Sequence, residues 1–320
     1  MNQYSDIESL CNDKLFLSRA EECEISNELD ILIQKAKRII RECYPNEVYT
    51  YSLPEKGHRC YVKLIQNDAI KYIISFPDNT IKNDLREITR IKEALGLNRE
   101  LVVYEEDGFC IMQKADEVID WNRSIIVDCI KKLRQMHNSN LSINRAFVNN
   151  YRILEKKFRD SITDAKITEL FGWDVSAWID TEIMTYLNKY KPVLCHGDAS
   201  YGNVLLFNNK AEWIDWELLQ MSNPMFDIFY FFESLYSGNV MSEQMSIQDF
   251  LHVYYEDRNL SSKEKMNVIC MGIYFLYWRI LNNAKSGIID EETIRVINRM
   301  KLFWQKKKFD AIYKYYMGDD

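Results

Sequence analysis

The stretch from Val193 to Glu217, which reads VLCHGDASYGNVLLFNNKAEWIDWE, decides how this chain is interpreted. Apolar runs alternate in it with polar segments, a pattern that predicts a strand, a tight loop, a second strand, a turn and a third strand. Asp198 lies in the loop, Asn203 follows five residues later, and Asp215 comes after the last apolar run. We expect the short hairpin between them to bring the two carboxylates to one place.

These three side chains are of the types that phosphoryl transfer requires. In a kinase catalytic loop an Asp takes the proton of the substrate hydroxyl, and an Asn five residues later binds Mg²⁺. Asn203 and Asp215 offer the hard oxygen ligands that Mg²⁺ prefers. A single loop Asp is more often a turn former, so the prediction rests on the three residues and their spacing together. His196 is expected to hold the loop through hydrogen bonds, and Glu217 to reach a metal through water.

Composition bounds the class of protein. The length of 320 residues suggests two domains, or two lobes around one cleft. The net charge of −7 argues against a general nucleic-acid or anionic-membrane binder. The eight cysteines show no metal-ligand spacing. Without a signal-peptide pattern or a run of about 18 apolar residues, a cytoplasmic protein with no membrane span is expected; the oligomeric state stays open.

The sequence pattern changes twice along the chain. Residues 1–45 have a helical apolar period and are expected to form a helical N-terminal extension. Residues 46–115 predict a small lobe, a sheet with one helix, and residues 116–320 a larger and mostly helical lobe. The strands of the small lobe are expected within residues 48–52, 60–65, 70–76, 101–104 and 108–112, with the helix within 81–95 and a hairpin turn at Asn67-Asp68.

The motifs then resemble a known family. His196-Gly197-Asp198, Asn203, the run from Ile214 to Glu217 and the run from Asn223 to Ile228 look like the aminoglycoside phosphotransferase and choline kinase superfamily, most of all its bacterial choline kinase-like proteins. The helix-borne Leu133 to His137 is similar as well. The resemblance covers roughly residues 48–285. It implies an α+β, protein-kinase-like bilobal fold that binds ATP between the lobes, with Asp198 as catalytic base, Asn203 and Asp215 as Mg²⁺ ligands, and His196 and Asp227 in structural roles.

The nucleotide half departs from the family pattern. The resemblance places the hinge that contacts adenine at Met112 to Ala115, including Lys114. The basic residue that the family carries on its third strand is replaced by Ser75, although the helix glutamate is present as Glu87. Lys63, from the neighbouring strand, is the preferred substitute for the phosphate-binding cation, and Lys71 and Lys82 are alternatives.

The acceptor pocket is expected in the helical lobe, which is dense in aromatic residues. Ring faces and a carboxylate would hold a quaternary ammonium through cation–π attraction. Candidate residues are Tyr274, Trp278, Glu217 and Glu233, although most such rings belong to helix cores. The leading hypothesis is therefore a kinase for the hydroxyl of choline or a related amino alcohol. Two alternatives stay open. One is an aminoglycoside phosphotransferase. The other is a non-catalytic nucleotide-binding pseudokinase or scaffold, which is suggested by Ser75 in place of the phosphate-binding basic residue.

Overall fold

The computed structural model divides the chain into two compact units. The first comprises Met1–Ile119 and Leu205–Glu217, and the second Asp120–Val204 and Leu218–Asp320. The structure describes residues 3–54, 60–78, 85–97, 99, 101–106, 108–116, 119–143, 164–243, 245–285 and 287–317.

The first unit is built on an antiparallel sheet of five strands in the order β1-β2-β3-β5-β4. Asn67 and Asp68, which link two of the strands, have φ values of 50° and 59°, the left-handed pair that suits a tight hairpin. The predicted hairpin and all five predicted strands are confirmed. Their bounds are β1 (Thr50–Ser52), β2 (Tyr61–Gln66), β3 (Ala69–Ser75), β4 (Val102–Glu106) and β5 (Phe109–Gln113).

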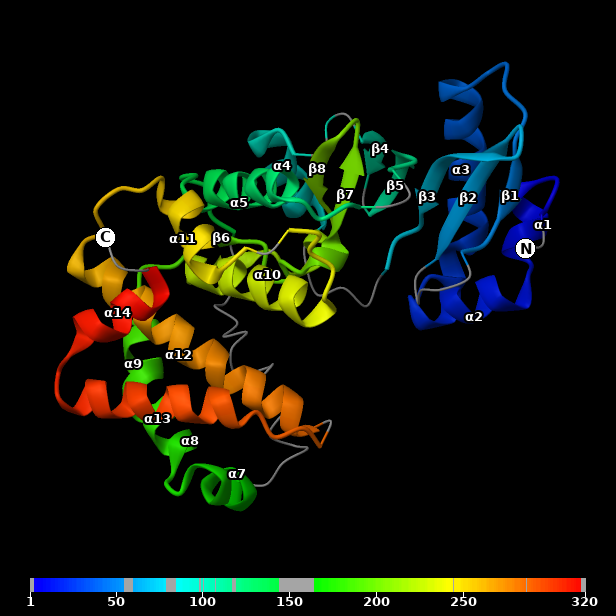
Figure 1. Ribbon diagram of the computed structural model, residues 1–320. Helices are drawn as coiled ribbons and strands as arrows, with labels where there is room; N and C mark the ends of the chain where they lie inside the picture. The colour runs from blue at the N-terminus through cyan, green and yellow to red at the C-terminus, as the bar shows by residue number, and fades with distance from the viewer. Residues whose placement is uncertain are drawn as a thin grey trace. The chain divides into compact units, whose positions relative to one another are not determined.

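One face of this sheet is covered by the N-terminal helices. Val62 lies opposite Ile74, and Ile74 opposite Ile111, so these side chains point the same way. They share one hydrophobic core with α1 (Ile7–Cys11), α2 (Lys14–Glu22) and α3 (Leu29–Cys43), which Figure 1 shows in blue beside β1 to β3. The apolar stripe of residues 1–45 is therefore buried against the sheet.

The other face carries polar residues. Ser75 lies opposite Cys110, and Cys110 opposite Glu105, so these three form a row on the face away from α1 to α3. Helix α4 (Leu85–Leu95) reaches this row, because the ammonium of Lys92 lies 2.7 Å from both carboxylate oxygens of Glu105.

The second unit is mainly helical. Its longest helix, α12, packs against α9, α10, α13 and α14, while α11 packs against α5; Figure 1 shows α12 and α13 side by side in orange and red. A short pair, β6 (Val193–Cys195) with β9 (Gln220–Ser222), supports the polar loop. The helices are α5 (Arg123–His137), α7 (Asp164–Phe171), α8 (Val175–Trp178), α9 (Met184–Leu187), α10 (Pro224–Gly238), α11 (Ile247–Tyr255), α12 (Ser262–Lys285), α13 (Glu291–Gln305) and α14 (Phe309–Met317).

A second hairpin follows the polar loop. β7 (Val204–Phe207) and β8 (Lys210–Trp213) are joined by Asn208 and Asn209, again a left-handed pair with φ values of 52° and 60°. The succession of strand, loop, strand, turn and strand is therefore confirmed, except that the third strand ends before Asp215. The predicted α+β class is also confirmed. Among the described helices, none has the length and apolar character needed to cross a membrane.

Candidate active site

The polar loop after β6 turns sharply at Gly197, in a backbone conformation that favours glycine. Leu194, Cys195 and His196 are fully buried. Gly197 has a φ of 83°, and a Cβ added there would lie 2.1 Å from the carbonyl oxygen of Leu218. The chain can therefore turn sharply at Gly197, and the turn brings Asp198 out of the buried strand to a half-buried position.

A buried carboxylate from α10 fixes this turn. Asp227 is fully buried and accepts hydrogen bonds from the backbone N–H groups of His196 (2.7 Å) and Gly197 (3.0 Å). It also lies 3.0 Å from Nε2 of His137 on α5. The other ring nitrogen, Nδ1, forms a hydrogen bond of 2.9 Å with the hydroxyl of Tyr254. Asp227 thus ties the loop to two helices.

Two side chains hold Asp198 itself. Nδ2 of Asn203 donates to the backbone carbonyl and to the carboxylate of Asp198, at 2.8 Å each. The hydroxyl of Tyr230 forms a hydrogen bond with Asp198 as well, and burial together with the Asp198 charge raises the pKa of Tyr230. Since the amide nitrogen of Asn203 is engaged, Oδ1 is the atom that it can offer to a cation. Sequence reasoning missed the role of Tyr230, although it lies three residues after Asp227 on the same helix face.

Two aromatic rings pack against the ring of Tyr230. Its ring stacks on Phe226 with centroids 5.7 Å apart, and Trp278 meets it edge-on at 6.3 Å. The predicted acceptor residue Trp278 therefore contacts the ring whose hydroxyl binds Asp198. Tyr274 is only 1% exposed and packs edge-on against Phe275, the position of a core residue.

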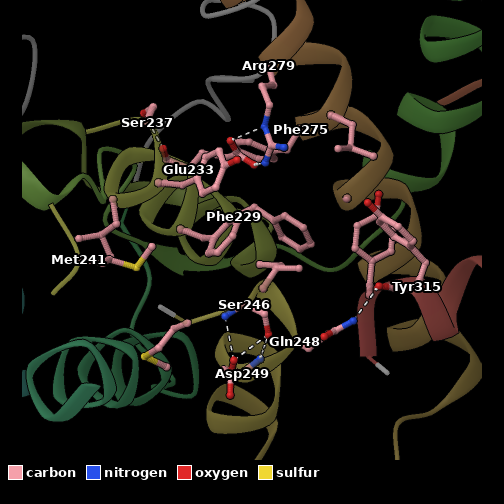
Figure 2. A pocket seen from close by; sticks show the side chains of 18 of the residues that line it. Phe229, Glu233, Ser237, Met241, Ser246, Gln248, Asp249, Phe275, Arg279 and Tyr315 are labelled. Carbon is pink, nitrogen blue, oxygen red and sulfur yellow. Dashed lines mark hydrogen bonds and ion pairs between the residues drawn. The ribbon is translucent and has the colours of Figure 1, made fainter. Parts of the chain in front are cut away.

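Glu233 lies one turn after Tyr230 on α10. Tyr230 and Ser234 contact the polar loop, whereas Glu233 lines a pocket of about 1240 Å³ within the second unit. Figure 2 shows its carboxylate paired with Arg279, which donates from Nε at 3.1 Å and from Nη2 at 2.5 Å. Burial raises the pKa of Glu233, and the guanidinium opposes that rise. Glu233 thus lines this pocket with Arg279, whereas Trp278 packs against Tyr230 beside Asp198.

The remaining metal candidate lies in the first unit. Asp215 follows β8 and has a φ of 64°, a left-handed conformation that is uncommon outside glycine and concentrated at functional sites. The indole Nε1 of Trp216 donates to the carbonyl of Trp213 at 2.9 Å and closes the turn around it. The side chain of Glu217 lies outside the described part of the structure.

The predicted nucleotide residues also lie in the first unit. Met112 is opposite Ile73 in the sheet, and the N–H of Lys114 donates to the carbonyl of Lys71 at 2.9 Å. From residue 113 to 116, Ala115 is the one whose N–H has no hydrogen-bond partner in the described chain.

Three lysine candidates and the helix glutamate complete the set. Lys63 lies opposite Ile73, so it shares the face of Ser75. Glu87 forms an ion pair with Arg90 one turn later in α4, at 3.7 Å. Lys71 is exposed, and Lys82 is outside the described residues. The structure thus brings Asp198 and Asn203 together in one unit, and Lys63, Ser75, Met112 and Ala115 in the other.

Comparisons with known proteins identify the family and the fold. The model of the phosphotransferase enzyme family, APH, matches residues 98–257, which include the loop, Asn203, Asp215 and Asp227. A comparison with curated protein sequences gives no match.

Two solved structures show the fold, each with a TM-score above 0.5. A choline/ethanolamine kinase family protein from Mesorhizobium loti is 12% identical, with a TM-score of 0.51 over 90% of this chain and 100% of that one. An ethanolamine kinase from Plasmodium vivax is 15% identical, with a TM-score of 0.52 over 95% and 94%. An aminoglycoside phosphotransferase from Alicyclobacillus acidocaldarius is 13% identical, with a TM-score of 0.46 over 83% and 90%. Because the family model matches half of the chain, this chain belongs to the phosphotransferase enzyme family.

Proposed function

We propose that this protein is an ATP- and Mg²⁺-dependent kinase that phosphorylates the hydroxyl of a small molecule, most of all choline or a related amino alcohol. The observation that carries the proposal is the holding of Asp198 by Asn203 and Tyr230, in a loop fixed by the buried Asp227. A carboxylate that is held and half-buried can orient a hydroxyl and take its proton.

Asn203 and Asp215 are the proposed Mg²⁺ ligands. Their amide and carboxylate oxygens suit this hard cation, and the engaged Nδ2 of Asn203 directs Oδ1 to that use. When bound, Mg²⁺ supplies positive charge for the phosphates. The amide of Ala115, beside Met112 and Lys114, would donate to adenine, with Lys63 and Glu87 on the phosphate side.

The choice of an amino alcohol is supported by the rings beside Asp198. Tyr230 and Trp278 offer aromatic surface for a quaternary ammonium, at about 0.5–2 kcal/mol per ring. Tyr274 stays a weaker candidate because it is almost completely buried.

A polycationic aminoglycoside would instead need several available carboxylates. Three of the acidic residues after Asp227 are paired with arginines of the protein: Glu233 with Arg279, Asp249 with Arg123, and Glu256 with Arg134. These pairs favour the small amino alcohol over the antibiotic phosphotransferase, which stays the second candidate.

The test combines a panel of acceptors with two substitutions. We expect MgATP to be consumed with choline or ethanolamine, and Asp198→Asn to lower turnover by about 10²–10⁴-fold while MgATP binding, measured by calorimetry, is retained. Trp278→Leu should raise the KM for the acceptor by about 2- to 30-fold and leave the KM for ATP unchanged.

Each alternative has its own outcome. Turnover with an aminoglycoside, and none with amino alcohols, would favour the antibiotic phosphotransferase. Nucleotide binding without turnover on any acceptor would favour the pseudokinase. Undiminished turnover by Asp198→Asn would refute the assigned base.

A further inference from the structure

A partly buried ion pair lies on the polar face of the sheet in the first unit. Lys92 on α4 and Glu105 on β4 have side chains only 10% and 20% exposed, and the ammonium contacts both carboxylate oxygens at 2.7 Å. Removing two charges from water is costly, and such a pair is often no more stable than apolar residues of the same size. Stability alone therefore does not account for it.

The pair lies in the row of Ser75. Glu105, Cys110 and Ser75 are consecutive cross-strand partners, so their side chains point to the same face. Adjacent strands are about 4.8 Å apart, which puts the backbones of Glu105 and Ser75 roughly 10 Å from one another. Cys110 lies between Glu105 and Ser75 in this row, and its pKa responds to the ion pair. Burial is the main cause that raises the pKa of Cys110 to about 12; the charge of Glu105 raises it further, and the charge of Lys92 lowers it.

We propose that Lys92, oriented by Glu105, supplies the cation that Ser75 cannot supply to the nucleotide phosphates. This inference rests on the proposed function, because it assumes that the face of Ser75 binds the phosphates. In the family pattern the basic residue is on a strand and the glutamate is on the helix. In this chain the helix α4 provides Lys92 and the strand β4 provides Glu105. Lys92 is suited to this role because its ammonium is already fixed by two hydrogen bonds, which lowers the entropy lost on binding.

The test compares the binding of MgADP and adenosine by calorimetry. Lys92→Met should weaken MgADP by about tenfold or more, the value of a charge-assisted contact, and leave adenosine, which has no phosphates, unchanged. The double variant Lys92→Met with Glu105→Gln should behave in the same way, and it leaves no unpaired carboxylate if the single variant folds poorly.

The chain offers a matched control. Lys35 on α3 also forms an ion pair with a β4 glutamate, Glu106, at 2.6 Å, and it is 19% exposed. Its ammonium lies over the rings of Tyr104 and Phe109 on the opposite face of the sheet. We therefore expect Lys35→Met to bind MgADP as the wild type does.

The outcomes separate the two proposals. If the wild type binds MgADP and both Lys92 variants bind it equally well, or if only Lys63→Met weakens it, the role of Lys92 is refuted and the kinase proposal stands. Equal weakening of adenosine would also refute it, because the loss would then be structural. If the wild type binds no MgADP, the kinase proposal itself fails.

Discussion

Replacing the buried Asp227 by asparagine should lower the stability of the protein, because Asp227 holds the loop that carries Asp198. The carboxylate accepts three hydrogen bonds, from the N–H groups of His196 and Gly197 and from Nε2 of His137. An asparagine has one acceptor oxygen, and its NH₂ group would face a donor. Removing one partner from such a buried network costs about 3–5 kcal/mol, which for a domain of 150–250 residues lowers Tm by roughly 6–20 °C.

The assay is thermal unfolding of Asp227→Asn beside a control with the same substitution at the surface. Asp257 also pairs with a histidine, His252, at 2.7 Å, but its side chain is 79% exposed. Asp257→Asn should therefore change stability by at most about 1 kcal/mol. If the two variants unfold within 2 °C of each other, on the order of 1 kcal/mol, the structural role given to Asp227 is wrong.

Two further predictions concern the loop glycine and the pH dependence of stability. Gly197→Ala should lower the free energy of unfolding, measured by denaturation, by about 3 kcal/mol or more, because left-handed strain adds to a clash with Leu218. The control Gly172→Ala, at a φ of 72° with nothing within 4 Å of the added Cβ, should lower it by about 1–2 kcal/mol. Equal losses of stability in the two variants would contradict the clash. The hydrogen bond from Arg258 is the main cause that lowers the pKa of Glu264 to about 2 from 4.5, so its contribution is complete above pH 4.5 and is lost as the pH falls toward 2. Glu264→Gln should flatten that part of the stability curve, and an unchanged slope would contradict the pairing.

Much of the fold could be predicted because local rules determine it. Alternating apolar residues and the pairs Asn67-Asp68 and Asn208-Asn209 define strands and turns within a few residues of sequence. The loop of Asp198 was predictable for the same reason, since a buried strand followed by glycine and short polar residues leaves few conformations.

Contacts between distant elements could not be predicted in this way. The periodicity of residues 1–45 shows that one side of a helix is apolar, but not that β2, β3 and β5 cover it. Lys92 was missed because a lysine in a helix is usually exposed. Its place in the apolar series Ile88, Ile91, Lys92 and Leu95 was the available signal.

The pairing of β3 with β5 decides which fragment of this protein could be studied alone. A fragment limited to residues 98–257, where the family model matches, would keep β5 and lose β3, and it would keep α10 and lose α12. Its strand edge and its apolar helix face would both be uncovered, a combination that promotes aggregation. The segment that identifies the chemistry is therefore shorter than the part of the chain that can fold around it.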